Sequence, residues 1–141
     1  MNATRSFSDG QHFEDFRPGD IYLSSVIGFT EDEIVAFAQR YDPQPFHADR
    51  EAAAASQFGG LIASGLQVMA ECLAALIRDG FMAGTGMGSP GLDEVRWHRP
   101  VRPGDAVRMR CSVLECRPSS TRSDRGYVTV FFEALNQGDN V

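Results

Sequence analysis

The spacing of apolar and polar positions changes partway along the chain. Over residues 64–79 apolar side chains recur every three or four positions, which predicts a long and largely buried helix. Residues 106–117 and 126–135 instead alternate between apolar and polar side chains, as in strands with one buried face. The side chains expected on the core faces of these strands are Val107, Met109, Cys111 and Val113 in the first, and Val128, Val130, Phe132 and Ala134 in the second.

Shorter elements precede the long helix. Residues 21–29 predict a strand, after which Thr30 and Glu33 form a capping box that opens a helix over about 31–40. Residues 41–47 contain two prolines, which predict an extended turn with no helix inside it.

Polar residues also mark the next two helices and a further strand. Asp49 is expected to cap a short helix over 50–56. Ser64 and Gln67 predict a second capping box, at the start of the long helix. Residues 92–98 predict a strand that leads into the two long ones.

This order of strand, helices and long strands predicts an α+β fold, in which a curved antiparallel sheet wraps around the central apolar helix of about 64–79. The length fits a single domain over residues 1–141. Residues 136–140 predict a hairpin turn with no strand pattern after it, so we expect a final strand to be lacking or not shown. Exposed sheet edges favour a homodimer or a higher homo-oligomer.

Charge and cysteine content narrow the partners and the compartment. The chain carries 13 basic and 19 acidic side chains, which argues against a nucleic-acid partner. All the basic residues are arginine, which excludes mechanisms that need a lysine. Eight arginines lie in residues 96–125, where an anionic ligand or a solvated sheet face explains them equally well. Three unpaired cysteines, and no signal or membrane segment, predict a cytoplasmic protein with no membrane partner.

Candidate chemistry gathers in two segments. Asp42 and His47 flank a connector made rigid by its prolines, so both side chains can serve one proton or water. A turn aspartate and a structural histidine would explain the same residues. Gly65 begins the long helix, where an unpaired N–H can bind a carbonyl oxygen that becomes an enolate, although tight packing also calls for glycine there. The GxGxxG match at residues 86–91 lies in a loop after a helix, which argues against a dinucleotide site.

These segments, read together, resemble one enzyme family. Residues 42–47 (DPQPFH) and 62–66 (IASGL) resemble the signature of the MaoC-like, or R-specific enoyl-CoA hydratase, family of the hotdog fold. Residues 99–105 (RPVRPGD) are similar to a strand and turn of the same family, and the resemblance covers about 17–137. Gln44 departs from the asparagine that is usual in the family signature.

The resemblance implies a hotdog dimer that adds water reversibly to a trans-2-enoyl-CoA, giving an (R)-3-hydroxyacyl-CoA. Asp42 and His47 would be catalytic, the Gly65 N–H would bind the thioester carbonyl, and Gln44 and Ser64 would support them. No metal and no cofactor is implied, since CoA is part of the substrate. A hotdog acyl-CoA thioesterase, for which Glu71 is the one acid in the middle of the long helix, and a non-catalytic acyl-thioester binding subunit remain alternatives.

Overall fold

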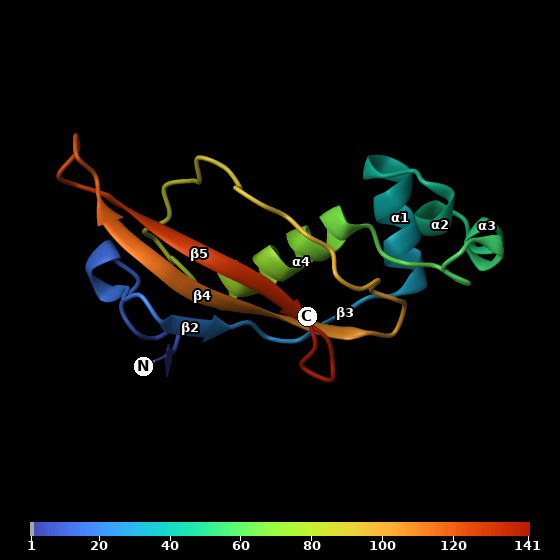
Figure 1. The fold of residues 1–141 in the computed structure, drawn as a ribbon, viewed down its shortest axis with the longest axis horizontal. Helices are drawn as coiled ribbons and strands as arrows, with labels where there is room; N and C mark the ends of the chain where they lie inside the picture. The colour runs from blue at the N-terminus through green and yellow to red at the C-terminus, as the bar shows by residue number, and fades with distance from the viewer. Residues whose placement is uncertain (1) are drawn as a thin grey trace.

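A long antiparallel hairpin forms the main part of the sheet in the computed structural model, which describes residues 2–141 (Figure 1). Its strands are β4 (Ala106–Pro118) and β5 (Gly126–Leu135), paired from Arg108 opposite Leu135 to Pro118 opposite Gly126. The other edge of β4 pairs with two short antiparallel strands, β2 (Asp20–Leu23) and β3 (Ile27–Gly28). The sheet is therefore antiparallel across its centre, as the alternating pattern predicted.

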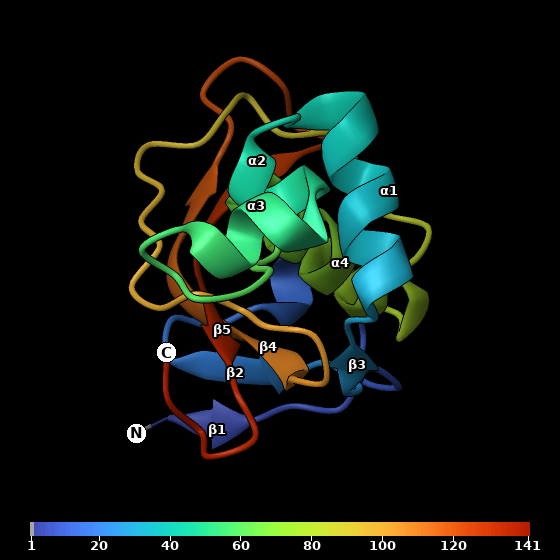
Figure 2. The same cartoon turned by 90° about the vertical axis from the view of Figure 1, so that its right-hand side faces the viewer.

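One long helix packs on the sheet and three shorter helices gather at the end where it begins (Figures 1 and 2). The long helix is α4 (Gly65–Arg78), close to the predicted 64–79. The short ones are α1 (Glu31–Tyr41), α2 (Pro45–Ala48) and α3 (Arg50–Ala55). Within residues 2–141 no helix has both the length and the apolar character needed to cross a membrane.

The core lies between α4 and the inner face of β4. The four predicted β4 side chains are at most 3% exposed, and they share one cluster with Val68, Cys72 and Leu76 of α4. The inner side chains of β5 pack against this cluster but stay only partly buried. Burial raises the pKa of the Cys72 thiol to about 11 and that of Cys111 to about 12. The predicted α+β layout is thus confirmed, with α4 as its central helix.

The predicted strand over 21–29 is wrong in its middle. The backbone N–H of Ser24 still donates to Met109, but Met109 donates in return to the Ser24 hydroxyl and not to a backbone carbonyl. The next N–H, of Ser25, bonds the Asp79 carboxylate at the end of α4. The chain leaves the ladder there, and β2 and β3 form two strands where the apolar pattern predicted one.

The prediction of no helix within residues 41–47 is also wrong. α2 begins at Pro45, and the N–H of Asp49 closes the turn on the Pro45 carbonyl. Proline suits the first position of a helix, because its ring presets φ and its missing N–H would be unpaired there anyway. The caps of the neighbouring helices are confirmed: Thr30 and Glu33 bond reciprocally, and the Asp49 carboxylate accepts the Ala52 N–H.

The second capping box does not form. Ser64 is the N-cap of α4, as predicted, but its hydroxyl accepts from the Leu66 N–H, and its own proton goes to Asp42. Gln67 is turned inward and is 1% exposed, and its Oε1 has no hydrogen-bond partner among residues 2–141. The Gln67 side chain therefore does not bond back to Ser64, and neither of the two bonds of a capping box is present.

Residues 92–98 form no strand, contrary to the prediction. The segment runs past α4 toward the short helices and pairs with no described strand (Figure 1). Within residues 2–141, β5 pairs only with β4, so its other edge is unpaired as well. The predicted hairpin turn is present, closed by the Asn136 N–H on the Asn140 carbonyl. The expectations that a final strand is lacking or not shown and that the protein is a homodimer stay predictions.

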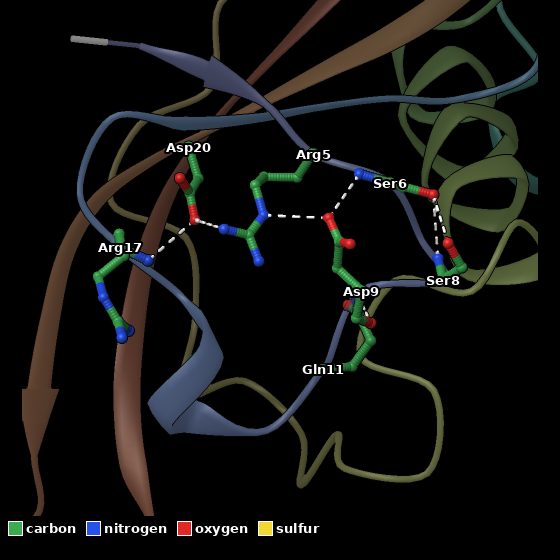
Figure 3. Close-up of polar contacts among 7 residues, drawn as sticks. All are labelled: Arg5, Ser6, Ser8, Asp9, Gln11, Arg17 and Asp20. Carbon is green, nitrogen blue, oxygen red and sulfur yellow. Dashed lines mark hydrogen bonds and ion pairs between the residues drawn. The ribbon is translucent and has the colours of Figure 1, made fainter.

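The N-terminal segment contacts the sheet through strand pairing and through ion pairs of Arg5. β1 (Ala3–Thr4) pairs in parallel with β2. Figure 3 shows the guanidinium group of Arg5 between two carboxylates, 3.2 Å from Asp9 and 3.8 Å from Asp20. The Asp20 side chain is only 6% exposed and also accepts the Arg17 N–H. Arg5 is thus the cation that compensates a buried charge.

We expect Arg5→Ala to lower the free energy of unfolding by about 2 kcal/mol, because it leaves the Asp20 carboxylate buried without its cation. Asp9→Ala removes the more exposed partner of the same arginine and is expected to cost less than about 1 kcal/mol. Urea unfolding of the two variants measures the difference. Equal losses would mean that Asp20 does not depend on Arg5.

Candidate active site

Two short segments hold the candidate residues at the end of the molecule where α1, α2 and α4 meet (Figure 2). Asp42 is the residue that ends α1, and its N–H still bonds the Ala38 carbonyl. Pro45 then starts α2, which carries His47 inward. The second segment is the stretch before α4, whose Ile62 N–H donates to the Phe46 carbonyl. Backbone hydrogen bonding therefore ties the two segments side by side.

His47 is held in one orientation and one tautomer. Its side chain is 7% exposed, and its Nδ1 lies 2.7 Å from the Ile62 carbonyl oxygen. Because a carbonyl oxygen only accepts, Nδ1 carries the hydrogen and donates it. In the neutral ring Nε2 is then an acceptor with a free lone pair. The histidine predicted from sequence is thus buried and oriented, with its reactive nitrogen on the side of Asp42.

Asp42 is held by hydrogen bonds to both carboxylate oxygens. The Ser64 hydroxyl donates to Oδ2 at 2.7 Å, and the Gln44 amide donates to Oδ1 at 3.1 Å. The Ser64 bond is the main reason why the pKa of Asp42 is lowered from its ordinary value; partial burial opposes it, and Gln44 and His47 lower the pKa by smaller amounts. The group is therefore a carboxylate at neutral pH. Gln44, the departure from the family signature, here contacts the predicted catalytic acid directly.

Two acceptors face one another across a short gap. Nε2 of His47 lies 3.4 Å from Oδ2 of Asp42, longer than a normal hydrogen bond. A lone pair and a carboxylate oxygen at this spacing are both satisfied by one donor with two hydrogens. A water molecule has that form: one O–H toward Nε2, the other toward Oδ2, and its own lone pairs left outward. The arrangement can therefore orient a nucleophilic water and accept its proton.

Gly65 directly follows Ser64 and is the first residue of α4. No described residue accepts its backbone N–H, as is usual for the first turn of a helix. A methyl group on Gly65 would lie 1.9 Å from Nε1 of Trp97, so the indole is packed directly against the glycine. Trp97 was not predicted as a site residue. The one available signal was that it is the only tryptophan of the chain.

The structure brings Asp42, Gln44, His47 and Ser64 into one bonded cluster, with Gly65 adjoining it through the chain. Many of the arginines of 96–125 are less available for an anionic ligand than their number implied. Those paired with an acidic side chain are Arg96, Arg108, Arg110 and Arg125. Arg102 donates to the Phe58 carbonyl, in the segment between α3 and α4. Arg108 and Arg110 lie on β4, so the interpretation of a solvated sheet face holds for these two, whereas Arg96 and Arg125 lie outside the strands.

The sequence matches a known protein family over most of its length. A family model described as the MaoC like domain matches residues 16–131. The chain therefore belongs to the MaoC-like dehydratase family, and its α+β layout is the hotdog fold of that family, as the resemblance implied.

Individual relatives agree with the family. The uncharacterized protein YdeM of Bacillus subtilis is 30% identical over 124 residues, which cover 88% of this chain and 86% of YdeM. The crystal structure of a MaoC-like dehydratase from Rhodospirillum rubrum is similar, with 40% identity, a TM-score of 0.86, and coverage of 94% of this chain and 90% of that one. The R-hydratase PhaJ1 of Pseudomonas aeruginosa is 26% identical at a TM-score of 0.67, over 92% of this chain and 78% of its own.

Ser64→Ala tests the hydrogen bond that does most to lower the pKa of Asp42. A carboxyl group with a depressed pKa stabilises the folded state above its unfolded pKa of about 4, and that stabilisation is lost as the pH falls through the folded value. We therefore expect the stability lost in Ser64→Ala to be larger near pH 7 than near pH 3. The lost helix cap contributes about 1 kcal/mol at either pH.

Ser56→Ala is the matched control. The Ser56 hydroxyl also bonds the backbone, to the Ala53 carbonyl and the Phe58 N–H, but no carboxyl group is among its partners. Its cost, measured by the same urea unfolding series, should not change with pH. A Ser64→Ala loss that is equally independent of pH would separate Ser64 from the ionisation of Asp42.

Proposed function

We propose that this protein catalyses the reversible hydration of a trans-2-enoyl-CoA to an (R)-3-hydroxyacyl-CoA. The observation that carries the proposal is the pair of acceptors, His47 Nε2 and Asp42 Oδ2, set 3.4 Å apart beside a helix start with an unpaired N–H. The membership of the MaoC-like family supports a hydratase or dehydratase, and the similar structure from Pseudomonas aeruginosa is titled an R-hydratase.

In the hydration direction the Asp42–His47 pair holds the attacking water. Its oxygen forms the new bond to C3 of the enoyl group, and one of its protons passes to the pair. The buried Nδ1–H bond to Ile62 keeps Nε2 of His47 as the accepting atom, and ionised Asp42 stabilises the imidazolium that forms. Since the same pair then returns a proton to C2, the two additions take place on one face of the double bond.

The electron pair displaced from the double bond moves onto the thioester oxygen. In this proposal the Gly65 N–H, at the positive end of the α4 dipole, binds that oxygen as it becomes an enolate. One C–O and one C–H bond form while one O–H bond and the carbon–carbon π bond break. Because the thioester itself takes up the electron pair, the reaction needs neither a metal nor a redox cofactor.

An apolar stripe on α4 supports an acyl substrate. Leu66, Leu73 and Ile77 lie along the helix surface that faces away from the sheet, and they are 44%, 39% and 55% exposed. The stripe begins beside Gly65, so an acyl chain whose carbonyl oxygen is bound at Gly65 can extend along the stripe.

The thioesterase alternative has less support. Glu71, the acid it would use, lies six residues beyond Gly65, or about 9 Å farther along the helix axis. Asp42 and His47 instead lie near Ser64, at the helix start, where the Ser64 hydroxyl bonds Asp42. The geometry therefore favours addition of water at the double bond over hydrolysis of the thioester.

We expect Asp42→Asn and His47→Gln to lower the rate of crotonyl-CoA hydration by about a hundredfold or more, because each removes an acceptor of the water proton. The assay follows the loss of enoyl-thioester absorbance and uses longer and branched enoyl-CoAs alongside. Circular dichroism and thermal unfolding confirm that each variant is folded.

The matched controls are Asp32→Asn and His12→Gln, which change the same residue types at side chains that are 94% and 77% exposed. Both should keep the wild-type rate. Release of free CoA without loss of the double bond would support a thioesterase instead. Wild-type hydration by Asp42→Asn or His47→Gln would remove that residue from the mechanism.

A further inference from the structure

The contact between Trp97 and Gly65 has a specific geometry. The position of a Cβ on Gly65 is 1.9 Å from Nε1 of the indole, 2.1 Å from Cε2 and 2.5 Å from Cδ1. These three ring atoms are neighbours and their distances are similar, so the face of the five-membered ring lies on the glycine. The N–H lies in the ring plane and therefore points past the Gly65 α-carbon, not into it.

Both nitrogens at this contact have a hydrogen to donate. Neither the Gly65 N–H nor the Trp97 indole N–H has an acceptor among residues 2–141, and Trp97 is 58% exposed. Backbone bond lengths put the two nitrogens within about 4.5 Å of each other. One carbonyl oxygen with two lone pairs can lie about 2.9 Å from both.

We propose that Trp97 is a second donor of the oxyanion site, with its indole N–H and the Gly65 N–H binding the same thioester oxygen. The proposal rests on the hydration function above and adds a catalytic residue to it. A donor already in place before the reaction stabilises the enolate more than the neutral carbonyl, since charge develops on the oxygen only in the transition state.

The lack of a side chain at Gly65 is part of the same arrangement. Any Cβ there would overlap the indole and force it outward. Since the obstructing atoms belong to an exposed side chain, Gly65→Ala is expected to fold with Trp97 displaced. Gly28 in β3 is the matched control, because a Cβ there meets nothing within 4 Å.

Trp97→Phe is the decisive variant, since it keeps an aromatic ring and removes the N–H. If the indole donates, kcat for crotonyl-CoA falls at least about tenfold while KM changes little. Trp97→Ala, which also removes the ring, should affect both constants. An unchanged kcat in Trp97→Phe overturns the proposal and leaves the hydratase function intact, provided that Asp42→Asn abolishes turnover in the same assay.

A binding measurement decides the case in which no enoyl-CoA is hydrated and the proposed function fails. Trp97 is the only tryptophan, so fluorescence excited selectively at tryptophan reports on this position alone. Titration with crotonyl-CoA should change the emission more than free CoA at equal concentration, and the change should be absent in Gly65→Ala but present in Gly28→Ala. Equal responses to crotonyl-CoA and free CoA would overturn the proposal.

Discussion

The hydrogen bond from His47 Nδ1 to the Ile62 carbonyl is the interaction on which the site depends. It joins the turn after α1 to the segment before α4, and it is buried, so water does not compete for it. It also decides which imidazole nitrogen has a free lone pair. Without it the ring could rotate, and the 3.4 Å approach of Nε2 to Asp42 would have no fixed direction. The position and the tautomer of the ring are thus set by a single backbone oxygen.

Ser64 links this arrangement to the long helix. Its hydroxyl is shared between the Leu66 N–H and the Asp42 carboxylate, so the cap of α4 and the charge of the acid are stabilised by one group. A carboxylate near a helix start is also favoured by the helix dipole. The Asp42 carboxylate therefore lies near the N–H groups that the proposed chemistry uses. It is hydrogen-bonded to Ser64, the cap residue, and not to those N–H groups.

The fold could be predicted where one physical rule acted alone. The alternation in β4 and β5 and the apolar face of α4 reflect burial, and both were predicted closely. Prediction failed where two rules competed. Proline argued against a helix within residues 41–47, but it is also favoured at the first position of a helix, and α2 begins at Pro45. Residues 92–98 have a strand pattern but no partner strand among the described residues. Trp97 could not be predicted because its contact with Gly65 joins residues distant in sequence.

Under the proposed function, the protonation of the cysteines has a chemical consequence. An acyl group passes readily from CoA to another sulfur, but only a thiolate attacks. Burial holds Cys72 and Cys111 in the protonated form, and burial is also the largest cause of the raised pKa of Cys116. Under that function, neither Cys72 nor Cys111 competes at neutral pH for the acyl group. These two thiols act as apolar packing in the core, so in the proposed reaction the acyl group stays on its carrier while it is bound.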